Sequence, residues 1–163
     1  MMGSGKSSVG PLLAARLNHA YVDLDQEIEA EAGVSIAEFF DQRGEADFRR
    51  MERTLLLAHL TSDTPKTIAL GGGALVDDEL RVRARAAAYL VCLGASARTL
   101  TKRVGDGAGR PLLAGDAESA LARLAHARGT AYADVDLVIA TDLASPRSVA
   151  SSVAAAIRAE GAP

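Results

Sequence analysis

The chain has 163 residues, 48% of them apolar and 24% charged, a composition typical of a globular protein that buries a core. Its net charge of −3 gives no reason to expect a nucleic-acid partner, and no apolar stretch approaches the ~20 residues that span a membrane. We therefore expect one cytoplasmic domain over residues 1–163.

The chain begins with most of a phosphate-binding loop. Gly5-Lys6-Ser7 matches the end of the pattern G-x-x-x-x-G-K-[ST], whose first glycine would lie one residue before the chain starts. In such a loop, backbone N–H groups and the following helix bind phosphates, the lysine reaches the β- and γ-phosphates, and the serine hydroxyl coordinates Mg²⁺. A dinucleotide-binding motif fits less well, because Ser8 stands where its third glycine belongs.

Short apolar runs then alternate with helical patterns. The candidate strands are continuously apolar, as in a parallel sheet buried on both faces, and span 20–23, 67–70, 88–93 and 137–140. The candidate helices, several of them opened or closed by capping residues, span 7–18, 25–32, 35–60, 96–103, 116–132 and 145–161. This alternation predicts an α/β fold with a parallel sheet.

Two carboxylates and three glycines follow strands of this pattern. Asp23 and Asp25 lie at the carboxyl end of the strand at 20–23, where parallel sheets bind ligands. One of them can serve a metal through water and the other can accept a hydrogen bond from a hydroxyl, although Asp25 could instead cap the next helix. Gly71-Gly72-Gly73 follows the next strand and would let a ligand approach the backbone, unless it forms a simple turn.

A glycine-rich segment interrupts the alternation at about 105–117. It contains Arg110-Pro111 between two predicted helices. The segment is either an ordinary surface loop or a mobile lid that closes over a nucleotide and brings Arg110 to it.

In order and spacing, these motifs resemble those of the shikimate kinase family. The resemblance runs from Met1 to about Ser148 and rests on Gly-Ser-Gly-Lys-Ser at 3–7, Asp23-x-Asp25, Ser35-Ile36-Ala37-Glu38, Gly44-Glu45 with Phe48-Arg49, Gly71-Gly72-Gly73-Ala74, Arg110-Pro111-Leu112-Leu113, and Arg128 with Tyr132. It implies a P-loop kinase-type three-layer sandwich with a parallel central sheet. It also implies transfer of the γ-phosphoryl group of ATP to the 3-hydroxyl of shikimate, in chorismate biosynthesis.

The resemblance implies a role for each matching residue. The nucleotide would be bound by Gly3, Ser4, Gly5, Lys6, Ser7, Ser8, Arg103 and Arg110. Shikimate would be bound by Asp25, Arg49, Gly71, Gly72, Gly73 and Arg128, with the two arginines on its carboxylate. Ser7 and Asp23 would hold Mg²⁺, the latter through a water molecule. Lys6, Asp25 and Arg110 would be catalytic, with Asp25 acting as a base or only positioning the attacking hydroxyl.

The chain departs from the family pattern in three places. The first, central strand and the first loop glycine are missing, which would remove about five buried apolar side chains, on the order of 10 kcal/mol. We therefore expect the chain as written to fold poorly and its true start to lie roughly ten residues upstream. Ser8 replaces a more usual threonine, a mild change. Gly129-Thr130-Ala131 replaces a segment with a proline, which should loosen the placement of Arg128.

Two alternatives to shikimate phosphorylation stay open. One is a related kinase for another hydroxy acid such as gluconate, and the other is a non-catalytic nucleotide-binding relative. Under the leading interpretation the partners are ATP, Mg²⁺ and shikimate, and the protein is a monomer.

Overall fold

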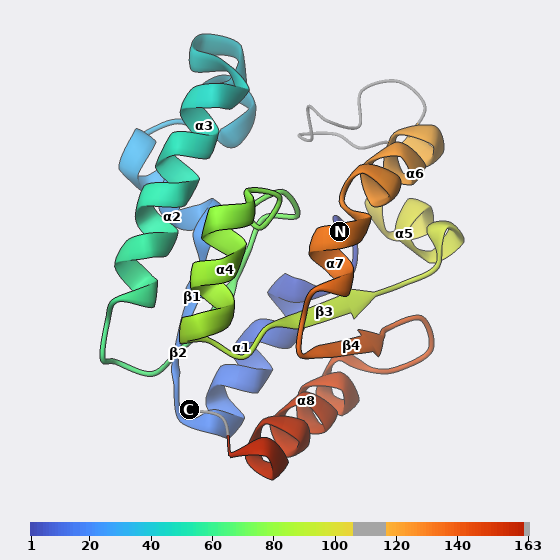
Figure 1. The fold of residues 1–163 in the computed structure, drawn as a ribbon. Coiled ribbons are helices and arrows are strands. Elements are labelled where there is room, and N and C mark those ends of the chain that lie inside the picture. The colour runs from blue at the N-terminus through green and yellow to red at the C-terminus, as the bar shows by residue number, and fades with distance from the viewer. Residues whose placement is uncertain (106–116, 162–163) are drawn as a thin grey trace.

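The computed structural model describes residues 1–105 and 117–161 (Figure 1). Its elements, in chain order, are α1 (Lys6–Leu17), β1 (Ala20–Asp23), α2 (Leu24–Ala32), α3 (Ile36–Leu60), β2 (Lys66–Ala69), α4 (Asp78–Ala87), β3 (Val91–Gly94), α5 (Ala97–Val104), α6 (Ala117–Ala127), α7 (Gly129–Ala133), β4 (Leu137–Ala140) and α8 (Pro146–Glu160). All four predicted strands are present, and the α/β class is confirmed. Among the described residues, no helix is long and apolar enough to cross a membrane.

The strands form two parallel pairs. In one pair β1 runs beside β2, with Ala20 opposite Lys66, and in the other β3 runs beside β4, with Val91 opposite Leu137. A largely apolar cavity of about 400 Å³ is lined by β2, β3 and α1, and each of these two strands is paired within the described residues along one edge only. The structure therefore has two separate two-stranded sheets where a single sheet was predicted. A strand ahead of the first residue lies outside this chain and stays a prediction.

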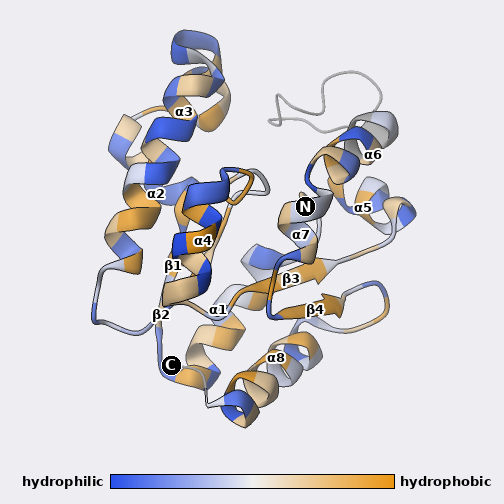
Figure 2. Cartoon of the chain, viewed as in Figure 1, coloured by the Kyte–Doolittle hydropathy of each residue, from blue (hydrophilic) through white to orange (hydrophobic). Residues whose placement is uncertain are grey.

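Two apolar clusters hold the helices together, and Figure 2 colours the hydrophobic residues of the chain orange. The first joins α1 and α8, with β3 and β4 packed against it, and consists of Val9, Leu13, Val149, Ala150, Val153, Ala154 and Ile157. The second joins α2, α3 and α4 and consists of Leu24, Ile28, Phe39, Phe48, Leu56 and Leu80. The phosphate-binding loop therefore extends from the first cluster, through α1, while the carboxylates and glycines border the second.

The predicted helix ends are largely confirmed. Gly33 ends α2 with a φ of 70°, and Ser35 with Glu38 forms the capping box that opens α3. Two predicted helices are interrupted, however. The helix predicted over 35–60 is kinked at Gly44, whose φ is 78°, and the one predicted over 116–132 is broken at Arg128, between α6 and α7. The break matters because it places Arg128 outside regular helix.

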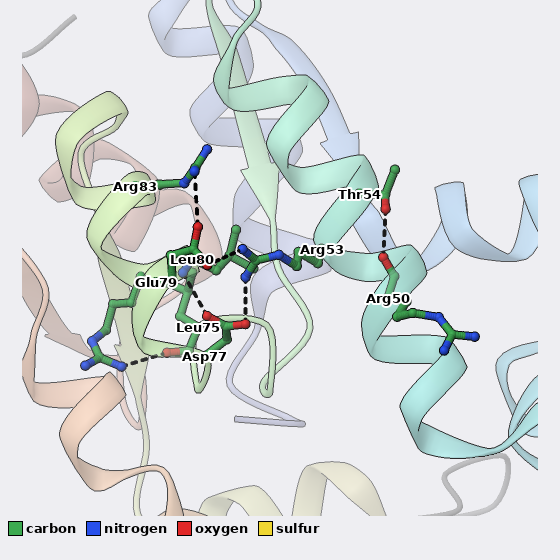
Figure 3. Close-up of polar contacts among 9 residues, drawn as sticks. Arg50, Arg53, Thr54, Leu75, Asp77, Glu79, Leu80 and Arg83 are labelled. Atoms are coloured by element: carbon green, nitrogen blue, oxygen red, sulfur yellow. Dashed lines mark hydrogen bonds and ion pairs between the residues drawn. The ribbon is translucent and has the colours of Figure 1, made fainter.

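Helix α4 was not predicted, although Asp77 caps it through the Leu80 amide at 2.9 Å. Figure 3 shows how Arg53 of α3 fixes its start, because the guanidinium donates to both Asp77 and Glu79 at 2.7 Å. The segment that joins β2 to α4 is thereby anchored at its far end. This segment contains Gly71 to Gly73, so the α3–α4 contact helps to place them.

The predicted lid lies mostly outside the described residues. Gly105 and Ala117 flank residues 106–116, and Arg110 belongs to that segment. Both the lid and the role of Arg110 therefore stay predictions.

Candidate functional site

The phosphate-binding loop turns tightly into α1. Gly3 and Gly5 have φ values of 74° and 101°, a left-handed conformation that residues with a Cβ rarely adopt. Helix α1 starts at Lys6, directly after Gly5, so its N-terminal amides face the loop. Such an end of a helix attracts anions, because its first N–H groups have no partners within the helix.

Thr141, directly after β4, binds the backbone of this loop through its hydroxyl. Its buried hydroxyl lies 3.1 Å from the Ser4 carbonyl oxygen and 3.1 Å from the Gly94 carbonyl oxygen. Arg103 donates to the Thr141 hydroxyl at 3.0 Å, to its carbonyl oxygen at 2.7 Å and to the Gly3 carbonyl oxygen at 3.3 Å. The arginine predicted to contact the nucleotide is therefore also part of the support of the loop. Sequence reasoning missed Thr141, which belongs to no motif.

A pocket of about 450 Å³ opens in front of the loop. It is lined by the loop residues from Met2 to Val9, by Asp23 and Asp25, and by Arg103, Thr141, Ala144 and Pro146. Every residue predicted to bind the nucleotide, apart from Arg110, lines this one pocket. The pocket-lining residues named here come from four separate segments of the chain, and α1, which follows the loop, packs against β1, β2 and α8.

Ser7 and Asp23 place two side-chain oxygen atoms at one edge of this pocket. The Ser7 hydroxyl donates to Asp23 Oδ2 at 3.4 Å. Among the described residues there is no group of three or more His, Cys, Asp and Glu side chains that could hold a metal by themselves. Two hard oxygen donors beside a phosphate site fit Mg²⁺, which keeps several waters and is shared with substrate phosphates.

The three consecutive glycines pack directly against three residues predicted to bind the acceptor. A Cβ built on Gly71 would lie 2.9 Å from Asp25 Oδ1, one on Gly72 would lie 3.0 Å from Arg128 Nη1, and one on Gly73 would lie 2.6 Å from Arg49 Nη2. Any larger residue would displace these groups. The alternative role of Asp25 as a helix cap is wrong, because Asp23 occupies the N-cap position and Asp25 lies in the first turn of α2.

Glu52 is a further member of this cluster that sequence reasoning missed. The residue is 1% exposed; Oε2 accepts a hydrogen bond from Arg49 Nη1 at 2.6 Å, and Oε1 has no hydrogen-bond partner. A Cβ on Gly71 would lie 2.7 Å from Oε1, so the carboxylate also borders the glycines. The available signal was its spacing: a glutamate three residues after Arg49 shares a helix face with it.

Burial sets the electrostatics of this cluster. The pKa of Asp25 is raised, chiefly by burial and next by the neighbouring charge of Asp23, while Lys6 and Arg49 oppose the shift. The pKa of Glu52 is raised by burial too, against the pull of Arg49. A carboxylate with a raised pKa accepts a proton more readily near neutral pH than an exposed one does.

Comparison with known proteins shows the family to which the chain belongs. The family model described as shikimate kinase matches residues 2–158. The chain belongs to the shikimate kinase family. It is 44% identical to a shikimate kinase of Paramagnetospirillum magneticum over 140 residues, which are 85% of this chain and 71% of that protein. It is 41% identical to one of Geobacter sulfurreducens over 158 residues, covering 96% and 87% of the two chains.

Solved shikimate kinases have the same fold. The enzyme of Acinetobacter baumannii in complex with shikimate superposes with a TM-score of 0.92 at 28% identity, covering 98% of this chain and 89% of that one. The enzyme of Aquifex aeolicus superposes with a TM-score of 0.85 at 27% identity, covering 99% and 94%. The predicted family and P-loop kinase fold are confirmed, and the chain is an ATP-dependent kinase of this family.

The missing proline after Arg128 predicted that this arginine would be placed more loosely than in the rest of the shikimate kinase family. In this chain Arg128 is 7% exposed and lies against Gly72. Tyr132, one turn further along, donates from its hydroxyl to the Gly72 carbonyl oxygen at 2.9 Å. Burial and this tyrosine bond bring α7 and the glycines together without the proline.

Proposed function

We propose that this protein transfers the γ-phosphoryl group of ATP to the 3-hydroxyl of shikimate. The observation that carries the proposal is the packing of Asp25, Arg49 and Arg128 against the three glycines, at the edge of the phosphate pocket that Asp25 also lines. One carboxylate and two guanidinium groups there match a small molecule with hydroxyls at one side and a carboxylate at the other.

We expect the positively and negatively charged residues of the site to have different roles. Arg49 and Arg128 would bind the carboxylate of shikimate and fix its ring, because an arginine fork matches a carboxylate in geometry and charge. Asp25 would accept the proton of the attacking hydroxyl as the new O–P bond forms and the bond to the ADP oxygen breaks. Lys6 and the loop amides would stabilise the charge on the transferred group, since phosphoryl transfer needs positioning and positive charge rather than covalent help.

We propose Ser7 and Asp23 as the residues that hold Mg²⁺, which when bound would neutralise phosphate charge. The 3.4 Å contact between the two side chains supports this, since both oxygens face the same pocket. We further propose that the protein is cytoplasmic and that it is a monomer. Size-exclusion chromatography with light scattering tests the monomeric state.

A coupled assay of ADP release tests the proposed function. The protein is incubated with ATP and Mg²⁺ alone, with shikimate, and with gluconate, and the product is located by phosphorus NMR. We expect ADP release that depends on shikimate, with the phosphate on the 3-oxygen. Turnover of gluconate alone would reject the proposed acceptor, and nucleotide binding without turnover of either acid would indicate a non-catalytic relative.

A further inference from the structure

The hydroxyl of Tyr21 contacts the same carboxylate oxygen as Ser7. It donates to Asp23 Oδ2 at 3.2 Å, while the Ser7 hydroxyl donates to that oxygen at 3.4 Å. Tyr21 and Asp23 are two residues apart on β1, so their side chains leave the strand on the same face. The tyrosine and the carboxylate that it contacts therefore belong to the same strand.

Gly10 gives the tyrosine ring its place. It is the one glycine inside α1 and is buried there. A Cβ added to it would clash with Tyr21 Cε2, closer than real Cβ atoms come, and would lie 3.2 Å from the tyrosine hydroxyl, a tight contact. The ring therefore rests on the backbone of the helix that begins at the phosphate-binding loop, and any side chain at position 10 would push it away.

We propose that Tyr21, seated on Gly10, is a positioning residue that orients the Asp23 carboxylate toward Ser7 for metal binding. The inference rests on the proposed role of Ser7 and Asp23 as the residues that hold Mg²⁺. No motif in the sequence indicates it, because neither Tyr21 nor Gly10 belongs to the phosphate-binding pattern.

The chemistry of the pair suits this role. A phenol keeps its proton at neutral pH, so the Tyr21 hydroxyl can donate to the carboxylate of Asp23. A carboxylate at the end of a four-residue strand can otherwise rotate about its terminal bond, and a fixed donor on one oxygen removes that freedom.

The test replaces Tyr21 by Phe, which removes the hydroxyl and keeps the ring on Gly10. The affinity for a fluorescent ATP analogue is measured in EDTA and again in saturating Mg²⁺, and the ratio of the two gives the contribution of the metal. We expect the ratio and the apparent affinity for Mg²⁺ to fall about 10-fold, the lower end of the effect of removing a partner of a metal-binding side chain. The affinity in EDTA should stay the same.

Tyr89→Phe is the matched control. Its hydroxyl also donates to a carboxylate, Glu160 Oε1 at 3.0 Å, but on the exposed surface and outside the nucleotide pocket. We expect no change in either affinity for this variant. A wild-type ratio in Tyr21→Phe, or an equal fall with and without Mg²⁺, would overturn the proposal, because the tyrosine would then have no role or only a structural one.

A second variant, Gly10→Ala, displaces the ring instead of removing the hydroxyl. We expect it to lower the Mg²⁺-dependent ratio as well, and we expect Tyr21→Phe to cause no further loss when added to it, since the contact is already broken. Fully additive losses would overturn the seating of Tyr21 on Gly10. Failure of the proposed function would appear separately, as wild-type protein that binds the nucleotide with Mg²⁺ but does not phosphorylate shikimate.

Discussion

Gly73→Ala should weaken shikimate binding while leaving the fold and the nucleotide site nearly intact. The new Cβ would lie 2.6 Å from Arg49 Nη2, about 0.8 Å short of the 3.4 Å at which ordinary contact begins. The guanidinium must therefore move by about that amount. Its pair with Glu52, now at 2.6 Å, would be stretched rather than broken, so we expect a loss of unfolding free energy of about 1 kcal/mol.

The effect on the acceptor should be larger. A charge-assisted hydrogen bond contributes about 1.5–3 kcal/mol, and each 1.4 kcal/mol corresponds to tenfold in affinity. We therefore expect the KM for shikimate to rise about 10- to 100-fold in steady-state assays, with the KM for ATP unchanged. The matched control is Gly129→Ala, because a Cβ there has no atom within 4 Å. Equal rises in both KM values, or no rise for shikimate, would refute the placement of Arg49 at the acceptor.

Three further predictions concern the buried polar groups and the cavity. Asp25→Asn should abolish most turnover but keep nucleotide affinity, and it should raise the melting temperature at neutral pH, because burial disfavours the charged carboxylate. That gain should shrink as the pH falls and vanish below 3.8, the ordinary pKa of the carboxyl, where the folded and the unfolded chain are both protonated; destabilisation at neutral pH would contradict the sign of the shift. Thr141→Val should cost about 1–3 kcal/mol in urea unfolding and raise the KM for ATP, whereas Thr101→Val, which removes a buried hydroxyl without a hydrogen-bond partner, should cost less. An extended valine- and leucine-rich peptide should pair with the edges of β2 and β3 that have no partner among the described residues, and should raise the melting temperature in proportion to its occupancy; an equal effect from the same peptide with a central proline would refute strand pairing.

Local patterns in the sequence predicted most of the elements. The capping box at Ser35 and the glycine after α2 act within one turn of the chain, so their effect does not depend on distant contacts. Helix α4 was missed although its N-cap, Asp77, is a local signal, and the further hold of Arg53 on its start comes from far away in sequence. The kink at Gly44 escaped as well, since one glycine inside a helical pattern does not reveal whether its φ will be positive.

Some residues of the candidate site were also predictable from the sequence and others were not. The loop motif and the order of Asp23, Asp25, Arg49 and Arg128 were enough to predict the family and the two substrates. Glu52, Thr141 and Tyr21 could not be found in this way. Thr141 contacts Ser4 only in the folded chain, whereas Glu52 and Tyr21 lie within three residues of the side chains they contact but belong to no motif.

The sequence by itself determined the class of reaction, because a phosphate-binding loop, a pair of aspartates and two arginines in this order indicate phosphate and carboxylate chemistry. The tertiary structure decided why three glycines follow β2: each leaves room for charged side chains that lie 2.6–3.0 Å from where a Cβ would be. It also decided which groups are buried, and so which pKa values shift. Burial and close approach depend on how distant segments pack, and no local pattern records that.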